Sequence, residues 1–133
     1  MATTTATLTI SSADLTSNPL AITTSSTLYK AGTTIGLEQT TGLSKKVYAA
    51  AQSNVTLISA GDYADNTHSR VYIRNSGSSS TDYFTIELGS SNLVLGRLYG
   101  GDFMFIPYEG EQDIDISSST TNMELEFMVI NEG

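Results

Sequence analysis

The sequence predicts an all-β fold, a single-domain antiparallel β-sandwich that is jelly-roll-like and carries an extended N-terminal arm or long loop. Three observations predict it. Several segments alternate apolar with polar side chains, which is the period of a half-buried strand. Turn residues separate these segments at intervals of about 8–12 residues, as they do in sandwiches and barrels. The one run of good helix formers, residues 49–52, is too short to form a helix in water.

The expected strands follow from this alternation in chain order. In residues 70–74, for example, Val71 and Ile73 lie on one face of the strand and the other side chains lie on the opposite face. Gly100 and Gly101 predict a β-hairpin between the two strands that flank them. Strands are expected at residues 5–10, 20–24, 27–30, 46–51, 55–59, 70–74, 83–88, 93–99, 102–107, 113–116 and 124–130.

The 133 residues fit one domain, which we expect to span residues 1–133. Within it, residues 1–45 are expected to be partly an extended arm or loop, and residues 46–133 to be the main sandwich. Only two of the eleven aromatic residues, Tyr29 and Tyr48, fall in the first sixty positions. Residues 32–43 show no clear period, and long segments of this kind are often functional or bound to a partner.

Two apolar runs near the C-terminus do not alternate. A run without alternation predicts a strand that is buried on both faces, either between two sheets or at a subunit interface. We therefore expect these eight residues to make core or oligomer contacts: Phe103, Met104, Phe105, Ile106, Phe127, Met128, Val129 and Ile130.

The composition argues against several classes of function. The net charge is −8, which disfavours binding to nucleic acid and to anionic membranes. The absence of cysteine excludes disulfides, thiolate nucleophiles and thiolate zinc sites. The chain begins without a signal-peptide pattern and has no apolar run of about 18 residues, so we expect synthesis in a cytoplasm, with retention there or release by a route other than a cleaved signal.

Few residues suggest catalysis, and we expect the protein not to be an enzyme. His68 is the only histidine, and Asp65 and Ser69 are near it in the sequence, but no nucleophile elbow accompanies them. A surface histidine is therefore the simpler interpretation. The phosphate-binding and zinc-protease motifs are also absent from the sequence.

The carboxylates leave three interpretations open. Asp113 and Asp115 are two residues apart on an expected strand, so both project from one face, and Glu124 and Glu126 do likewise. Such a group is explained by a solvated polar face, but it also has the chemistry of a Ca²⁺ site or of the acid pair of a glycosidase. Glu109 and Glu111 precede the first pair. We expect no bound metal and no cofactor.

Four segments resemble a known type of protein. Residues 70–75 read Arg-Val-Tyr-Ile-Arg-Asn, residues 96–108 read Gly-Arg-Leu-Tyr-Gly-Gly-Asp-Phe-Met-Phe-Ile-Pro-Tyr, residues 123–129 read Met-Glu-Leu-Glu-Phe-Met-Val, and residues 40–46 read Thr-Thr-Gly-Leu-Ser-Lys-Lys. Together they resemble small virion structural proteins of marine tailed bacteriophages, of the capsid decoration or cement kind. The resemblance implies a virion location and a β-sandwich, and it carries over no catalytic residues.

On this resemblance we expect a decoration protein that binds the outer surface of a tailed-phage head and stabilises it. Its expected partners are the major capsid protein and itself, as a homotrimer. The expected capsid contacts are Leu8, Ile10, Ile35, Leu37 and Leu43. The alternative is a phage tail or fibre component whose β-domain binds host glycans through tyrosines, since these rings both stack and form hydrogen bonds.

Overall fold

The computed structural model describes residues 3–63 and 68–132, and every regular element in them is a β-strand. All of the strand pairs are antiparallel, which confirms the predicted all-β antiparallel class. The chain forms two compact units, residues 1–38 and residues 39–133. The expected division at residues 45 and 46 therefore falls inside the second unit, which we call the body.

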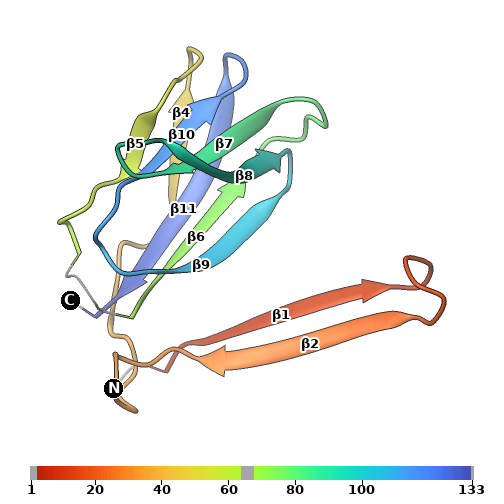
Figure 1. Ribbon diagram of the computed structural model, residues 1–133, viewed down its shortest axis with the longest axis vertical. Coiled ribbons are helices and arrows are strands. Elements are labelled where there is room, and N and C mark those ends of the chain that lie inside the picture. Colours follow the sequence, from red (N-terminus) through yellow and green to blue (C-terminus); the bar gives the residue numbers. More distant parts are fainter. Residues whose placement is uncertain (1–2, 64–67, 133) are drawn as a thin grey trace. The chain divides into compact units, whose positions relative to one another are not determined.

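The first unit contains one long β-hairpin, which we call the arm (Figure 1). Strand β1 (Thr5–Ser12) pairs with strand β2 (Leu20–Thr27) along the whole length of both. The two short strands expected at residues 20–24 and 27–30 are one strand that ends at Thr27. Small and β-branched side chains fill both strands, and these residue types favour extended backbone.

The segment that follows the arm is partly ordered by main-chain bonds. The Leu28 amide donates to Thr4 O (2.9 Å), and the Leu37 amide donates to Leu28 O (3.0 Å). Leu28 and Leu37 are both only 2% exposed. Tyr29 and Gly36 form a β-bridge, so the expected loop at residues 32–43 is not wholly without regular structure.

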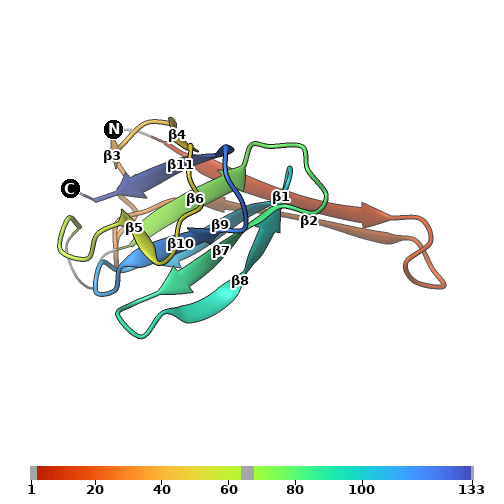
Figure 2. The ribbon, with the colours of Figure 1, turned by 90° about the horizontal axis from the view of Figure 1, so that it is seen from above.

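The body is built from two sheets that face each other (Figures 1 and 2). One sheet has the strand order β5-β10-β7-β8, and the other has the order β3-β11-β6-β9, with β4 also pairing to β11. The strands of the body are β3 (Gln39–Thr40), β4 (Ser44–Tyr48), β5 (Val55–Ile58), β6 (Ser69–Asn75), β7 (Tyr83–Leu88), β8 (Leu93–Tyr99), β9 (Phe103–Tyr108), β10 (Ile114–Ser118) and β11 (Met123–Asn131).

Both sheets contribute to the core of the body. The buried apolar cluster consists of Leu57, Ile58, Val71, Ile73, Phe84, Ile86, Leu98, Tyr108, Ile114, Ile116, Met123, Leu125 and Val129. Strands β6 and β7 alternate, so the apolar side chains of each point into the core from one face. In β5 the neighbours Leu57 and Ile58 are both buried. The predicted faces of residues 70–74 and 83–88 are confirmed, with Val71, Ile73, Phe84 and Ile86 buried.

The predicted hairpin at Gly100 and Gly101 is wrong. Strand β8 pairs with β7, strand β9 pairs with β6, and the two glycines lie at a corner where the chain crosses from one sheet to the other. The corner is held by the end of β6 and the loop that follows it, since the Gly101 amide donates to Asn75 O (2.9 Å) and the Gly100 amide donates to Ser79 O (2.9 Å). Two flexible residues suit a corner as well as a hairpin, and distant loop contacts decided between them.

The apolar runs are not buried on both faces within the chain. In β9, Met104 and Ile106 pack against the core, whereas Phe103 is 57% exposed and Phe105 is 40% exposed. In β11, Phe127 packs against the core and Val129 is buried, whereas Met128 and Ile130 are only partly buried. Within one chain these strands are covered on one face only, because each belongs to one layer of a two-layer sandwich and only that face meets the other sheet. The alternative, that a subunit covers the second face, stays a prediction.

Candidate functional site

The arm has two faces of different chemistry. The register pairs Leu8 with Thr24 and Ile10 with Ile22, and strand alternation places these side chains on one face together with Leu20. The opposite face carries the hydroxyl residues Thr5, Thr7, Thr9, Ser11, Thr23, Ser25 and Thr27, with Ala21 among them. One face of the hairpin is therefore mainly apolar, with Ser12, Thr24 and Ser26 also on it, and the other face is mainly covered with hydroxyl groups.

The apolar face of the arm is open to solvent. Leu8, Ile10 and Ile22 are exposed by 42%, 44% and 45%. Neither strand contains a charged residue, although charge on a free strand is a common protection against unwanted pairing. A two-stranded hairpin is at best marginally stable in water, and it gains stability when its apolar face packs on another surface. The arm therefore has the properties of a segment that docks.

The expected capsid contacts differ in accessibility. Leu8 and Ile10 lie on the apolar face of the arm, and Ile35 and Leu43 are exposed elsewhere, at 43% and 60%. The expectation for Leu37 is corrected, because its side chain is buried and cannot reach a partner. Ile22 was not predicted as a contact, although the alternating positions of Leu20, Ile22 and Thr24 indicate that it shares a strand face with Leu20.

A second exposed surface covers one side of the body. It is formed by the side chains of β9, β6, β11 and β4 that point away from the core, and we call it the outer face. Tyr72 lies between Phe105 and Met128, and Arg74 lies between Phe103 and Glu126. Arg70, Pro107, Ile130, Lys45 and Val47 complete the outer face. It combines aromatic, methionine and arginine side chains, which are enriched at the centres of protein interfaces.

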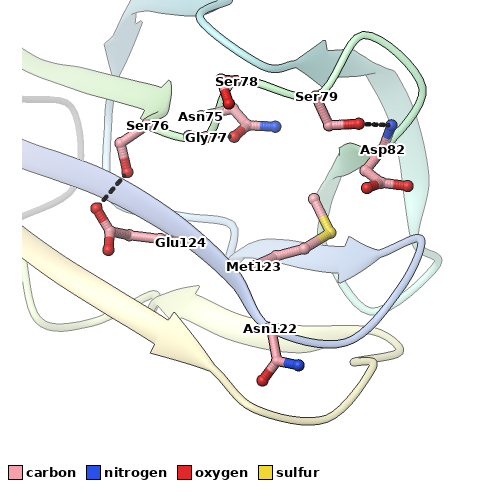
Figure 3. Close-up of a pocket in the computed structure, with 9 residues that line it drawn as sticks. All are labelled: Asn75, Ser76, Gly77, Ser78, Ser79, Asp82, Asn122, Met123 and Glu124. Atoms are coloured by element: carbon pink, nitrogen blue, oxygen red, sulfur yellow. Dashed lines mark hydrogen bonds between the residues drawn. The ribbon is translucent and has the colours of Figure 1, made fainter.

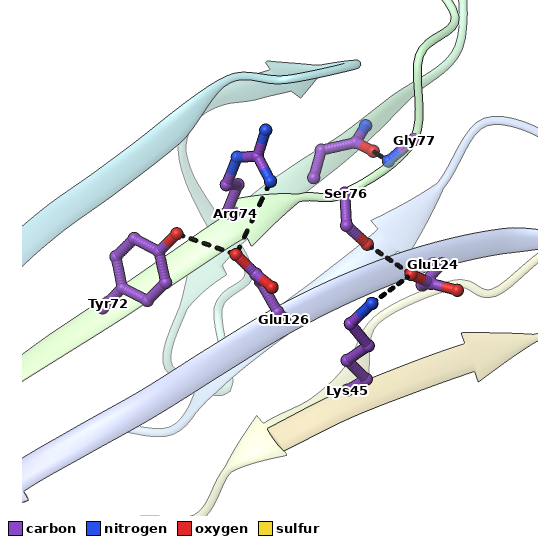
Figure 4. Close-up of polar contacts among 8 residues, drawn as sticks. Lys45, Tyr72, Arg74, Ser76, Gly77, Glu124 and Glu126 are labelled. Atoms are coloured by element: carbon purple, nitrogen blue, oxygen red, sulfur yellow. Dashed lines mark hydrogen bonds and ion pairs between the residues drawn. The ribbon is translucent and has the colours of Figure 1, made fainter. Parts of the chain in front are cut away.

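Both carboxylates of the outer face are paired within the chain (Figure 4). Glu126 accepts a hydrogen bond from the Tyr72 hydroxyl (2.9 Å) and lies 3.6 Å from the Arg74 guanidinium. Glu124 accepts a hydrogen bond from Ser76 (2.9 Å) and lies 3.3 Å from the Lys45 ammonium. Glu126 is thus largely covered within a structural network, whereas Glu124, whose side chain is 38% exposed, keeps part of the solvated face expected from the sequence.

This network shifts two pKa values. Partial burial and the hydrogen bond to Glu126 raise the pKa of Tyr72 above its ordinary value of 10.0. The hydrogen bond from Ser76 and the nearby Lys45 ammonium lower the pKa of Glu124 below 4.5. Both shifts keep the network intact across the neutral range, with the tyrosine protonated and the carboxylate charged.

The body also has a pocket of about 310 Å³ at the end of the sandwich where the β6–β7 loop meets the start of β11 (Figure 3). Most of its polar groups already have partners inside the chain. The Asn75 amide donates to Leu98 O (2.9 Å) and accepts from the Gly77 amide (2.9 Å), and Ser79 Oγ accepts from the Asp82 amide (3.1 Å). The polar lining is thus used mainly to fix the loop.

The remaining carboxylates do not gather into one group. Asp113 precedes β10 and accepts a hydrogen bond from the Ala60 amide (2.6 Å). Asp115 is buried and lies opposite the buried Glu87, so the solvated face expected for it is wrong. Glu109 and Glu111 are exposed in the loop before β10. Within residues 3–63 and 68–132, no three acidic or histidine side chains are close enough to hold a metal ion.

His68 lies on the surface, next to a pocket of about 420 Å³ that Arg70, Pro107 and Glu109 also line. Its main-chain amide donates to the Glu132 carboxylate, and its ring Nε2 lies 2.9 Å from the Arg70 guanidinium. A guanidinium so close does not act as the orienting acid that a catalytic histidine needs. Asp65, the acid considered as its partner, lies outside the described residues.

Comparison with known proteins gives no family for this chain: no family model, no curated protein and no solved structure matches it. In the part of the chain that the structure describes, no helix has the length and apolar character needed to cross a membrane. The arm and the outer face therefore provide the observations on which a function can be based.

Proposed function

We propose that this chain is a capsid decoration protein, which binds the outer surface of a tailed-phage head and stabilises the shell by contact and without catalysis. The observation that carries the proposal is the arm, a long uncharged hairpin whose apolar face has no cover. An assembly protein needs a segment of this kind, because docking it on a neighbour removes apolar surface from water. The proposed partner is the major capsid protein, and the proposed location is the surface of the virion.

Two further observations support this choice. The eight strands β4 to β11 form two sheets in the orders β4-β11-β6-β9 and β5-β10-β7-β8, which is the order expected of a jelly roll. Jelly rolls occur in viral capsid proteins and in lectins. The resemblance of residues 70–75, 96–108 and 123–129 to virion structural proteins of marine tailed phages favours the first of these.

The proposed mechanism is stabilisation by mass action. A protein that binds the intact shell and not its disrupted form shifts the equilibrium toward the intact shell. The binding site is repeated over the shell. Each arm can therefore bind with modest affinity, while the total free energy by which many bound copies stabilise the shell becomes large. The net charge of −8 keeps the unbound protein soluble before it docks.

Two substitutions on the apolar face of the arm test the proposal against one on its hydroxyl face. Leu8→Asp and Ile10→Asp place a charge where the shell is expected to pack, so each should weaken binding to purified phage heads that lack this protein by at least about tenfold. Thr9→Asp places the same charge on the opposite face and should bind like the wild type. Co-sedimentation with the heads measures all three.

Undiminished sedimentation of the Leu8→Asp and Ile10→Asp variants with the heads would contradict the proposal. The alternative, a tail or fibre component that binds host glycans, would use the pocket lined by Ser78, Asp82 and Asn122, since the Asn75 amide beside them is already bonded within the chain. Binding of a sugar in that pocket, together with no binding to heads, would select the alternative.

A further inference from the structure

We propose that the outer face of the body is a contact surface between two copies of this chain, packed sheet against sheet about a two-fold axis. The inference goes beyond the proposed function and does not rest on it, because it concerns the purified protein without a shell. It also differs from the trimer that the resemblance suggests. Four properties of the outer face support it: its composition, its internal pairing, its charge and its extent.

The composition of the outer face is that of an interface centre. Phe103 and Phe105 expose large aromatic surface, and Tyr72 and Met128 lie beside Phe105 in the middle of the sheet. Aromatic and methionine side chains offer much contact area and are enriched where protein interfaces exclude water. On a sheet of this kind, the aromatic rings would be expected inside the core if the outer face were meant only for solvent.

The polar groups of the outer face are prepared for burial. A charge that is covered by a partner without its own counter-charge is costly, because it loses its hydration. Here Glu126 already has Tyr72 and Arg74, and Glu124 already has Ser76 and Lys45 (Figure 4). A second molecule can therefore cover the outer face without leaving either carboxylate unpaired.

The distribution of charge selects a second copy as the partner. Among the strand residues of the outer face, Lys45, Arg70 and Arg74 face the two carboxylates Glu124 and Glu126, so the face carries +1. The whole chain carries −8, so the remainder carries −9. In a contact about a two-fold axis each patch meets itself, so patches of the strongly negative remainder repel their own copies, whereas two outer faces bring together little net charge.

The extent of the outer face is sufficient for a weak specific pair. Four strands spaced by about 4.8 Å, each contributing about six residues at about 3.3 Å, cover roughly 400 Å² in projection. With the relief of the side chains on both copies, the contact reaches about 1,000 Å², the lower end of specific interfaces. The two strands of the arm cover only roughly 270 Å² by the same measure, which is too little for a pair.

Sedimentation equilibrium of the full chain, with one variant and one matched control, tests the inference. The wild type should show a mass that rises with concentration from 14.2 kDa toward twice that value. Phe105→Glu should weaken this association by at least about 30-fold, as expected for a central interface residue. Leu93→Glu replaces a more exposed apolar residue on the other sheet and should associate like the wild type.

Three results would overturn the inference. The first is a wild type that keeps the mass of one copy up to about 1 mM. The second is a Phe105→Glu variant that associates as strongly as the wild type. The third is a wild type whose mass at high concentration approaches that of three copies. Weakening by Ile10→Asp in the same experiment would place the contact on the arm and would also overturn it. Unchanged far-UV spectra confirm that the variants fold, as expected for exposed side chains.

Discussion

At Gly100, the absence of a side chain lets two segments of the body meet. A Cβ atom at this position would lie 2.6 Å from the main-chain N and O atoms of Ser79, much closer than such atoms approach. The neighbouring Gly101 has a φ of +89°, which favours glycine. Glycine is required at position 100 because another segment approaches closely there, and it is favoured at position 101 because the backbone is left-handed. Together they turn the chain from the β8 sheet into the β9 sheet.

Two tyrosine hydroxyls differ in what they contribute to stability. Tyr48 packs its ring edge-on against Phe84, but its buried hydroxyl has no hydrogen-bond partner among the described residues. The Tyr108 hydroxyl donates to Gln112 O (2.8 Å). We expect Tyr48→Phe to raise the free energy of unfolding by up to about 1 kcal/mol and Tyr108→Phe to lower it by about 1 kcal/mol, measured by urea denaturation.

The difference in stability between Tyr48→Phe and the wild type should depend on pH. Burial raises the pKa of the Tyr48 hydroxyl above its unfolded value of 10.0, so the folded state holds this proton more tightly. The stability that this proton confers is complete below about pH 10 and is lost as the pH rises toward the folded pKa. The advantage of Tyr48→Phe should therefore grow above pH 10. If Tyr48→Phe is destabilised as much as Tyr108→Phe, the Tyr48 hydroxyl has a hydrogen-bond partner and the prediction is wrong.

At the scale of one element, β9 has neighbouring residues with opposite environments. Met104 packs against the core, and Phe105 is 40% exposed on the outer face. We expect Met104→Asp to lower the free energy of unfolding by about 3 kcal/mol or more, because its carboxylate would be desolvated. Phe105→Asp should cost less than about 1 kcal/mol in the monomer. Thermal unfolding at low concentration compares them, and equal losses would contradict the alternation of β9.

The arm shows the same alternation without a core beneath it. Its apolar side chains form a continuous face only because the register pairs Leu8 with Thr24 and Ile10 with Ile22. A shift of one residue would mix the two faces, since the side-chain period of a strand is two. The docking role proposed for the arm thus depends on register as much as on composition.

At the scale of the whole molecule, the chain forms two compact units, and the large apolar cluster lies within the body alone. We therefore expect residues 39–133 to fold without the arm, with a Tm within about 5 °C of the full chain, whereas residues 1–38 should be unfolded alone. Calorimetry and far-UV spectra of the two pieces measure this. Loss of cooperative unfolding in residues 39–133 would show that the first unit is part of the same folding unit.

Much of the fold could be predicted because strand patterns are local. The alternation in residues 83–88 located β7 at its observed bounds, since a half-buried strand shows its period in its own side chains. The bounds of β8 were also predicted, but from the glycines that follow it and not from alternation. The site was less predictable. Leu8 and Ile10, which were predicted as contacts, are exposed, whereas Leu37 has the same apolar character and is buried, and only the surrounding chain distinguishes them.

The amino-acid sequence alone predicts that the chain is all-β, where most of its strands lie and which side chains of those strands share a face, because these features depend on residues a few positions apart. The tertiary structure decided that β8 and β9 belong to different sheets, that Phe103 and Phe105 point outward, and that Glu126 meets both Tyr72 and Arg74. These features depend on contacts between segments distant in the chain. No local period encodes which strand will become the neighbour of another.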